Sequence, residues 1–312
     1  MQIRHFEEKR DLQKLEDYLR EQYRINKNMT TWLPERLHDM LYRMRAQEAA
    51  SGGARSVDYI FLWEEDDAVV ACILPDGENI YMSVKAGYEH LFESMLAYSE
   101  KNCLPLFRKA EDGSVKFWVA ANDSLAYMQT ALVQAGYARY PEEDYDNCVR
   151  LQETEVSVEL PAGFRLAYGE EYPDEENKWT ALHLGFHPDH ELPGYRTDMQ
   201  PYLSRKRSSL YPDCFECLVI DETTSEANNV CAYCFVYVDR QTRTALVEPV
   251  STREKYQRKG IGKAMMHGVM RRCKEIGVEH CYVNSFGWRK KFYNAAGFVT
   301  EDTVGFWYKF LR

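Results

Sequence analysis

The segment 257–263 carries residue types that bind a phosphate group through the backbone. Two glycines, one residue apart, leave no Cβ between the chain and a ligand, and three cations surround them. Apolar residues at helical spacing follow and stop at Gly277, so the glycines stand where a helix begins. The free N–H groups of a first helical turn favour an anion. We expect a pyrophosphate on the amides of this anion loop, which comprises Arg258, Lys259, Gly260, Ile261, Gly262 and Lys263.

Two other phosphate-binding motifs are excluded by their spacing. An ATP-binding P-loop needs G-x-x-x-x-G-K-[ST], which does not occur in the sequence. A dinucleotide fingerprint needs a third glycine where this chain has Met265. The alternative that stays open is an ordinary helix start without a ligand.

A second motif lies downstream, and the pair resembles a known family. Gln257-x-x-Gly260-x-Gly262, after a strand that ends in Val250-Ser251-Thr252, resembles the acetyl-CoA-binding motif Q/R-x-x-G-x-G/A of the GNAT (GCN5-related N-acetyltransferase) superfamily. The later segment FYNAAGF, residues 292–298, is similar to the family's F/L-Y-x-x-x-G-F. The two motifs in this order are more specific than either alone, and the clear resemblance covers residues 245–298.

The resemblance implies acetyl-CoA as acyl donor and direct attack by an amine acceptor. The anion loop would hold the pyrophosphate, while Val250, Ser251 and Thr252 would hold the pantetheine and the thioester. A backbone N–H would stabilise the oxyanion of the tetrahedral intermediate. Family members often contact the cofactor through an asparagine where this chain has Phe286; Asn284 is the nearest substitute, at an offset position.

Two residues are candidates for the proton transfers. Tyr293 stands at the family's general-acid position, and the alternative is a tyrosine of the core. Glu248 is the candidate general base, because strict alternation along a strand would place it on the same face as Val250 and Thr252. Otherwise Glu248 is structural, or a water molecule relays the proton.

The order of elements indicates an α/β fold with mixed sheets, built as two tandem GNAT-like domains. Each half reads as strand, two helices, hairpin, strand, helix, strand, helix and strand. In the N-terminal half the second helix is expected at 33–50 and the hairpin at 58–75, with the acidic turn EEDD. In the C-terminal half the second helix is expected at 197–211, and VGFWYKF, residues 304–310, is expected as the closing strand. We place a degenerate domain at 1–155 and the acetyl-CoA-binding domain at 156–312. The N-terminal half lacks the glycine motif and has Leu132 in place of the tyrosine.

Charge and composition limit the possible partners. The net charge of −10 disfavours a nucleic-acid partner, whereas eight Lys/Arg and one acid between Pro249 and Lys274 suggest one anionic ligand or a solvated helix face. The N-terminus has no apolar signal region, and no apolar run approaches the ~20 residues that span a bilayer. We therefore expect a cytoplasmic protein without a membrane partner. The oligomeric state stays open, a monomer included.

Two clusters could suggest a metal. Cys214-x-x-Cys217 and Cys231-x-x-Cys234 have near-zinc spacing, but they run into strands, so buried thiols are the preferred interpretation. In His183-x-x-x-His187-x-x-His190 the first two residues would share a helix face. We expect no metal. We assign the loop 185–195, with His187 and His190, to the acceptor site, with a plain surface loop as the alternative.

Three functions remain from the sequence alone. The first is an acetyl-CoA-dependent N-acetyltransferase that acts on a small or peptide amine. The second is an acyl-CoA-binding regulator without turnover, and the third is a zinc-dependent binding module. Glu248 and Tyr293 together favour the first.

Overall fold

The computed structural model of the chain describes residues 1–29, 32–44, 48, 52, 54–190 and 214–312. The chain divides into two compact units, which are not continuous segments. Unit 1 comprises 1–146, 285–287 and 301–312, and unit 2 comprises 147–284 and 288–300. The first change from unit 1 to unit 2 falls at 146/147, while the domain bounds 1–155 and 156–312 stay a prediction. None of the helices within the described ranges is long and apolar enough to cross a membrane.

Unit 1 is built on a mixed sheet whose strand order is β1-β2-β3-β4-β5-β12-β6. The expected hairpin with the turn EEDD is confirmed: β2 and β3 pair antiparallel and the turn residues Asp66 and Asp67 have positive φ. Strands β4 and β5 pair parallel, as a strand–helix–strand unit does. The strands are β1 (Gln2–His5), β2 (Phe61–Glu65), β3 (Ala68–Asp76), β4 (Asn79–Val84), β5 (Val115–Asn122), β6 (Ala138–Arg150) and β12 (Val299–Leu311).

Helices cover this sheet on two faces, each with its own core. One core packs beneath α4 and α5 and includes Phe92, Phe117 and Leu132; the other packs beneath α1 and α2 and includes Leu15 and Leu62. The expected helix over 33–50 is helical from Pro34 to Met44, where α2 passes into a π-helical turn at Met40–Met44, and residues 45–47, 49 and 50 lie outside the described part of the chain. The helices are α1 (Glu8–Asn26), α2 (Pro34–Asp39), α4 (Phe92–Asn102) and α5 (Ala126–Gln134).

The strand β12 is the element whose place the sequence did not predict. We expected VGFWYKF to close the C-terminal sheet, but β12 pairs antiparallel with β5, from Val304↔Asn122 to Leu311↔Val115. Trp307 enters the core of unit 1 and is 6% exposed. The last strand in the described chain therefore completes the first unit.

Unit 2 repeats the same design. Its sheet has the order β11-β10-β9-β8-β7, with the end of β6 beside β11. The hairpin of β8 and β9 is antiparallel, as the sequence predicted. Strands β10 and β11 pair parallel. The strands are β7 (Phe164–Tyr168), β8 (Phe215–Asp221), β9 (Val230–Asp239), β10 (Thr244–Thr252) and β11 (His280–Phe286).

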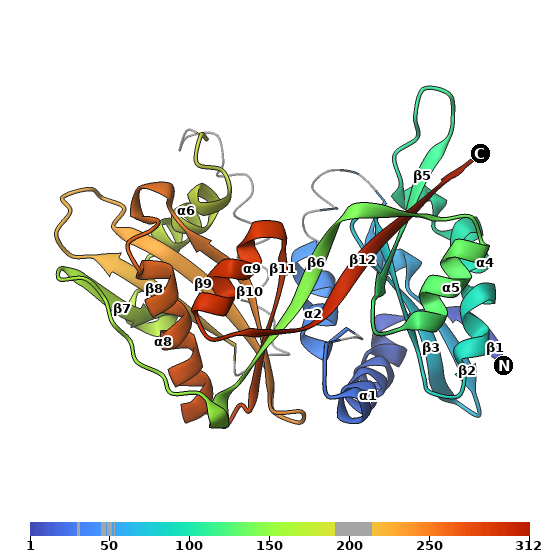
Figure 1. Cartoon of the computed structure of the whole chain (residues 1–312), viewed down its shortest axis with the longest axis horizontal. Coiled ribbons are helices and arrows are strands. Elements are labelled where there is room, and N and C mark those ends of the chain that lie inside the picture. The colour runs from blue at the N-terminus through green and yellow to red at the C-terminus, as the bar shows by residue number, and fades with distance from the viewer. Residues whose placement is uncertain (30–31, 45–47, 49–51, 53, 191–213) are drawn as a thin grey trace. The chain divides into compact units, whose positions relative to one another are not determined.

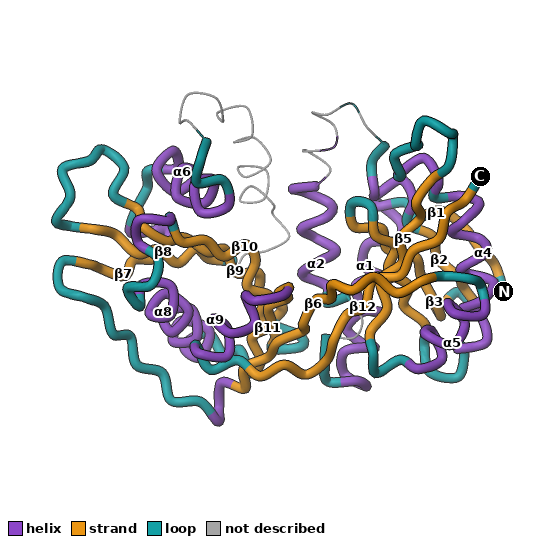
Figure 2. The backbone as a smooth tube through the Cα atoms, turned by 45° about the horizontal axis from the view of Figure 1, so that its top comes forward, coloured by secondary structure: helices purple, strands orange, loops and turns teal. Residues whose placement is uncertain are grey.

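Three described helices accompany this sheet, whose strands lie between α6 and α8 (Figure 2). The apolar face of α8, with Met265 and Val269, packs on the inward-facing residues of β8 to β11 (Figure 1). The expected helix at 197–211 lies outside the described residues. The helices are α6 (Glu175–Phe186), α8 (Ile261–Glu275) and α9 (Lys290–Ala295).

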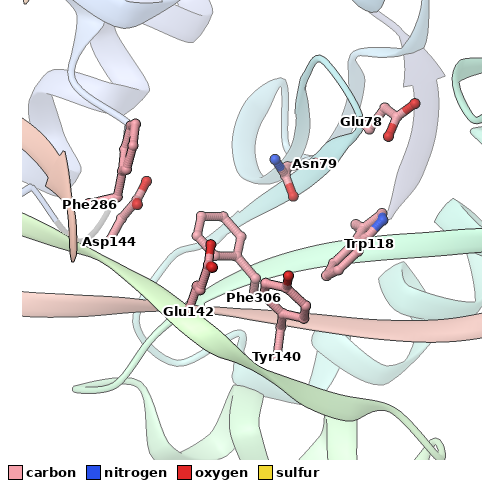
Figure 3. A pocket seen from close by; sticks show the side chains of 8 residues that line it. All are labelled: Glu78, Asn79, Trp118, Tyr140, Glu142, Asp144, Phe286 and Phe306. Carbon is pink, nitrogen blue, oxygen red and sulfur yellow. The ribbon is translucent and has the colours of Figure 1, made fainter.

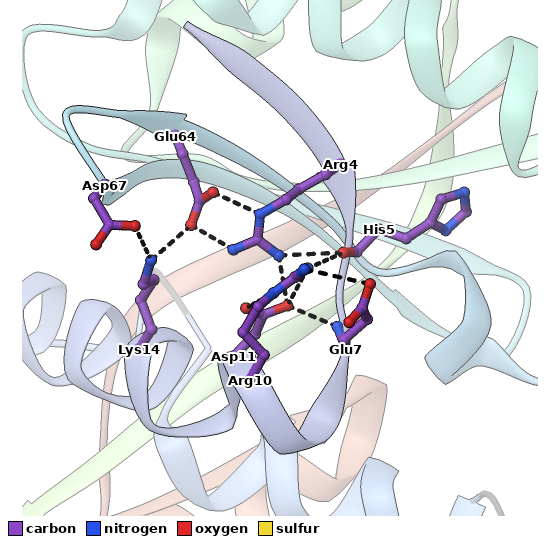
Figure 4. A network of polar contacts seen from close by, with 8 residues as sticks. All are labelled: Arg4, His5, Glu7, Arg10, Asp11, Lys14, Glu64 and Asp67. Atoms are coloured by element: carbon purple, nitrogen blue, oxygen red, sulfur yellow. Dashed lines mark hydrogen bonds and ion pairs between the residues drawn. The ribbon is translucent and has the colours of Figure 1, made fainter.

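A network of ion pairs ties the edge strand β1 to α1 and β2 (Figure 4). The Arg4 guanidinium donates to both carboxylate oxygens of Glu64, at 2.6 and 2.5 Å, and to Asp11 at 2.5 Å. Asp11 is fully buried and also accepts the backbone N–H of Glu7 at 2.7 Å. Burial opposes ionisation, but the hydrogen bonds from Arg10, Arg4 and the Glu7 amide outweigh it and hold the pKa of Asp11 below its usual value.

We predict that Asp11→Asn lowers the free energy of unfolding of unit 1 by about 2 kcal/mol at pH 7, because it leaves a largely buried guanidinium short of one charged partner. The folded pKa of Asp11 is depressed, so its contribution is present above an unfolded pKa of about 3.9 and is lost as the pH falls through the folded value. Urea denaturation should therefore show a smaller gap between the two proteins near ~pH 3 than at pH 7.

Asp67→Asn is the matched control, since Asp67 belongs to the same network but its side chain is 92% exposed. We expect it to cost less than about 1 kcal/mol. An Asp11→Asn deficit that is the same at both pH values would contradict the role given to the ionised carboxylate.

Candidate active site

The site of unit 2 begins where β10 and β11 separate. These parallel strands pair at only three positions, from Thr244↔His280 to Leu246↔Tyr282. Beyond Leu246, β10 continues to Thr252 beside β9 alone. The end of β10 is therefore open on the side of β11.

A β-bulge in β10 corrects the expected position of Glu248. Val247 lies opposite Val236, but Val250 lies opposite Cys234, so two residues of β10 take the place of one. Val247 and Val250 consequently point to the same face, and the simple alternation that grouped Glu248 with Val250 and Thr252 does not apply. The inference from alternation was wrong because it assumed a regular strand.

The anion loop is held against the end of β10 by two contacts. The Gln257 side-chain amide donates to the Thr252 carbonyl at 3.0 Å. Gly262 lies so close to the strand that an added Cβ would stand 3.1 Å from the Thr252 hydroxyl and 3.1 Å from the Phe292 ring. Gly260 caps α8 in the left-handed region, with φ 81°. The glycines thus serve close approach and a left-handed cap.

These elements enclose a cavity of about 620 Å³ within unit 2. It brings together the end of β10, the anion loop with the start of α8, the end of α6 and the segment around α9. Its lining consists of Gly185, Phe186, Val250, Ser251, Thr252, Gln257, Arg258, Gly260, Gly262, Lys263, Trp288, Arg289, Lys291, Phe292, Tyr293 and Ala295. Eight residues predicted from the sequence for cofactor binding or catalysis therefore line one cavity.

The lining is basic and partly aromatic. Four cationic side chains and no carboxylate occur among the described residues that line it, and the first turn of α8 has no acidic residue. The unpaired N–H groups of that turn add partial positive charge. The arrangement suits a ligand that combines phosphate groups with a hydrophobic or thioester part.

Tyr293 lies on α9 in this cavity and is 7% exposed. Its ring packs edge-on against Phe292 and Phe298. Burial raises the pKa of Tyr293, the charge of Glu248 raises it further, and Arg289 lowers it. The phenol is therefore protonated at neutral pH, as a proton donor must be, and it interacts electrostatically with Glu248.

Four residues that the sequence predicted for cofactor binding or catalysis are not in the described lining of the cavity. Ile261 is buried in the core of unit 2, so only its backbone faces the loop. The Lys259 ammonium lies 5.5 Å from the centroid of the Tyr256 ring. Neither Asn284 nor Glu248 is among the lining residues.

The histidines at the end of α6 form a cluster of their own. His183 Nε2 lies 3.0 Å from His190 Nδ1, and the rings of His187 and His190 stack at 4.6 Å. Neither His187 nor His190 belongs to the cavity lining, although Phe186 does. Of the expected acceptor loop 185–195, residues 191–195 lie outside the described part of the chain.

The cysteines are thiols in the structure. None of the nine forms a disulfide bond and eight are buried; Cys217 and Cys234 lie directly opposite each other in β8 and β9. The described residues contain no group of three potential ligands arranged to hold a metal ion.

Sequence reasoning missed the contribution of the segment that precedes Tyr293. Trp288, Arg289 and Lys291 all line the cavity, and Trp288 is 74% exposed. The signal that could have found them is the run WRKK between the predicted strand and the predicted helix. Gly185, the first residue of the expected acceptor loop, does line the cavity, and an added Cβ there would stand 2.5 Å from the Cβ of Ser251.

Comparison with known proteins agrees with this geometry. Residues 214–300 match the model of the acetyltransferase (GNAT) domain. No curated protein matches the sequence at a significant level.

Several solved structures are similar over most of the chain. A GCN5-related N-acetyltransferase from Sphaerobacter thermophilus is 15% identical with a TM-score of 0.58, over 89% of this chain and 94% of that one. A tandem GNAT protein from the clavulanic acid biosynthesis pathway is 15% identical with a TM-score of 0.53, over 87% and 93%. A GNAT-family acetyltransferase from Colwellia psychrerythraea is 13% identical with a TM-score of 0.56, over 99% and 100%.

At these identities the structural matches show the fold, while the domain model identifies the family of the segment that carries the anion loop and Tyr293. Residues 214–300 are thus a GNAT acetyltransferase domain, in a chain with the fold of GNAT proteins, tandem ones included.

Proposed function

We propose that unit 2 is an acetyl-CoA-dependent N-acetyltransferase that transfers the acetyl group to an amine by direct attack. The observation that carries the proposal is the single cavity shared by the end of β10, the anion loop and Tyr293. Its volume of about 620 Å³ suits a cofactor-sized ligand. Its four cations suit a ligand with several phosphate charges.

Different residues bind different parts of acetyl-CoA. The amides at the start of α8, with Arg258 and Lys263, hold the pyrophosphate. The backbone of Val250 to Thr252, open where β11 separates, pairs with the pantetheine and directs an N–H at the thioester oxygen. Ser251 contributes its backbone groups and not its side chain to cofactor binding, since its hydroxyl donates to the Ala181 carbonyl at 3.2 Å.

The chemical step needs one proton removed and one supplied. The amine nitrogen attacks the thioester carbon, a base takes a proton from the nitrogen, and the C–S bond breaks as Tyr293 donates its proton to the leaving thiolate. Glu248 is the proposed base, acting directly or through a water molecule. The electrostatic interaction between Glu248 and Tyr293 supports their acting at one centre.

The direct test is a screen of small amines and N-terminal peptides against the full chain and acetyl-CoA, in which the free thiol of CoA is measured. Turnover with an amine supports the proposal. Binding of acetyl-CoA without CoA release from any amine would favour a non-catalytic acyl-CoA-binding regulator instead.

Unit 1 has a different arrangement at the corresponding turn after β4. There the Gly87 N–H donates to both oxygens of the Glu89 carboxylate, at 3.0 and 2.9 Å. These hydrogen bonds, with one from the Glu89 amide, lower the pKa of Glu89. The Glu89 carboxylate thus accepts the hydrogen bond of the Gly87 amide, which an anionic ligand would otherwise accept. Leu132, at the position of the tyrosine, is buried in the core.

We predict that Gly260→Asp weakens acetyl-CoA binding by roughly tenfold or more relative to Gly260→Asn, measured by calorimetry. Asn and Asp have the same shape and tolerate the left-handed backbone similarly, so the comparison isolates the charge placed beside the pyrophosphate. Equal affinity of the two variants would place the phosphates elsewhere.

We predict that Tyr293→Phe lowers kcat by ~10²-fold or more and leaves the Kd for acetyl-CoA nearly unchanged, as expected for loss of a general acid. Tyr168→Phe, which removes a half-buried hydroxyl of unit 2 outside the cavity, should keep kcat within about twofold of the wild type. Similar kcat values for both variants would assign Tyr293 to packing alone.

We predict one acetyl-CoA per chain, because Glu89 and Leu132 occupy the corresponding positions in unit 1. Calorimetric titration of the full chain should saturate near one equivalent. Saturation near two equivalents would show that unit 1 binds the cofactor as well.

A further inference from the structure

One face of the unit 1 sheet carries a row of aromatic side chains that the proposed function does not use. Tyr308 lies directly opposite Trp118 in the β5–β12 pair, and their ring centroids are 5.2 Å apart. Tyr140, on β6, meets Trp118 edge-on at 5.3 Å. Their neighbours in the strands, Phe117 and Trp307, point to the opposite face and enter the core. The aromatic row therefore lies on the side of the sheet away from α4 and α5.

A pocket of about 270 Å³ opens on this face, and all of its lining residues belong to unit 1. Tyr140, Glu142 and Asp144 alternate along β6 and so share one side of that strand. In Figure 3 the rings of Phe306 and Tyr140 lie between Trp118 on one side and Asp144 with Phe286 on the other. The lining consists of Glu78, Asn79, Trp118, Tyr140, Glu142, Asp144, Phe286 and Phe306.

The charge of this pocket is opposite to that of the cavity in unit 2. Three of the eight lining residues are carboxylates and none is basic. In the described part of the chain, Glu78 and Glu142 make no ion pair or hydrogen bond through their side chains. Clustered carboxylates in a concave surface attract a cation and repel an anion.

The same aromatic surface already binds a cation that belongs to the chain. The Lys116 ammonium lies 4.2 Å from the centroid of Trp118, 4.2 Å from that of Tyr308 and 5.5 Å from that of Tyr140. These distances are within the ~6 Å typical of cation–π contacts. The rings are thus oriented to stabilise positive charge, independently of the carboxylates.

We propose that this pocket binds a small organic cation with an alkylammonium group. The carboxylates of Glu78, Glu142 and Asp144 supply the charge, and Trp118, Tyr140 and Phe306 supply ring surface for its methyl or methylene groups. A hydrated metal ion would gain little from such rings, whereas a weakly hydrated ammonium gains from both. The pocket is separate from the cavity of unit 2, and the proposal does not depend on the acetyltransferase activity.

Choline is a suitable probe, because its neutral carbon isostere 3,3-dimethylbutan-1-ol has the same shape without the charge. Calorimetry on the full chain at low ionic strength should show that choline binds roughly 5- to 30-fold more tightly than the isostere. Equal affinities, or no heat of binding at millimolar choline, would overturn the proposal.

Two substitutions locate the site. Glu142→Gln and Trp118→Leu should each weaken choline binding by roughly fivefold or more, since they remove a carboxylate or a ring. Glu142 is exposed on its strand, so its variant tests the charge without a change in the core. Glu111→Gln is the matched control: it removes an exposed carboxylate of unit 1 outside the pocket and should leave the affinity within about twofold.

A third variant separates this pocket from unit 2. Gly260→Asp adds a carboxylate to the cavity of unit 2, so choline bound there would bind the variant more tightly. We expect the same choline affinity as for the wild type. Choline binding that is unaffected by Glu142→Gln and Trp118→Leu, or that is strengthened by Gly260→Asp, would show that the cation binds elsewhere.

Discussion

The site in unit 2 depends on the short pairing between β10 and β11. Parallel strands that stayed paired to their ends would satisfy each other's backbone groups and leave no free strand end. Here the register stops at Leu246↔Tyr282, so the last residues of β10 are available to a ligand along one edge. The bulge at Glu248 and Pro249 lies at the same place. A bulge bends its strand and increases the local twist, which is a physical reason for the separation.

The other parts of the site are fitted to that open strand end. Gln257 fixes the loop to the Thr252 carbonyl, and Gly262 lets α8 start within contact of Thr252. On the opposite face of the sheet, Gly185 brings α6 against Ser251. A Cβ at Gly185 would overlap Ser251, and one at Gly262 would crowd the Thr252 hydroxyl and the Phe292 ring, so both approaches favour a residue without a side chain. The close packing of three elements on one strand end keeps the backbone donors in place before any ligand arrives, which is the arrangement that electrostatic stabilisation of an oxyanion requires.

Much of this could be predicted from the sequence, and the limits have physical causes. The two sequence motifs and the strand end before them contain the anion loop, Tyr293 and the end of β10. The structure brings these three parts together in one cavity. The face of Glu248 was missed because alternation assumes a regular strand, although Pro249 within the predicted strand was a signal of a bulge. The acidic, aromatic pocket of unit 1 was not predictable either: its residues come from positions near 79, 118, 142, 286 and 306, and no local spacing relates them. The partner of β12 was missed because alternation shows which face a strand buries but not which strand it joins.

The position of β12 has a consequence for biosynthesis. The partner residues Asn122 and Val304 are separated by the whole of unit 2 in the sequence, so β5 leaves the ribosome long before the strand that covers it. At about 5–20 residues per second the interval is on the order of 10–40 s. During that time β5 has an exposed edge, and such an edge is prone to pair with other chains. The nascent N-terminal half therefore passes through a stage in which the edge of β5 is open to pairing with other chains, and all the strands of unit 2 are synthesised before the last strand of unit 1.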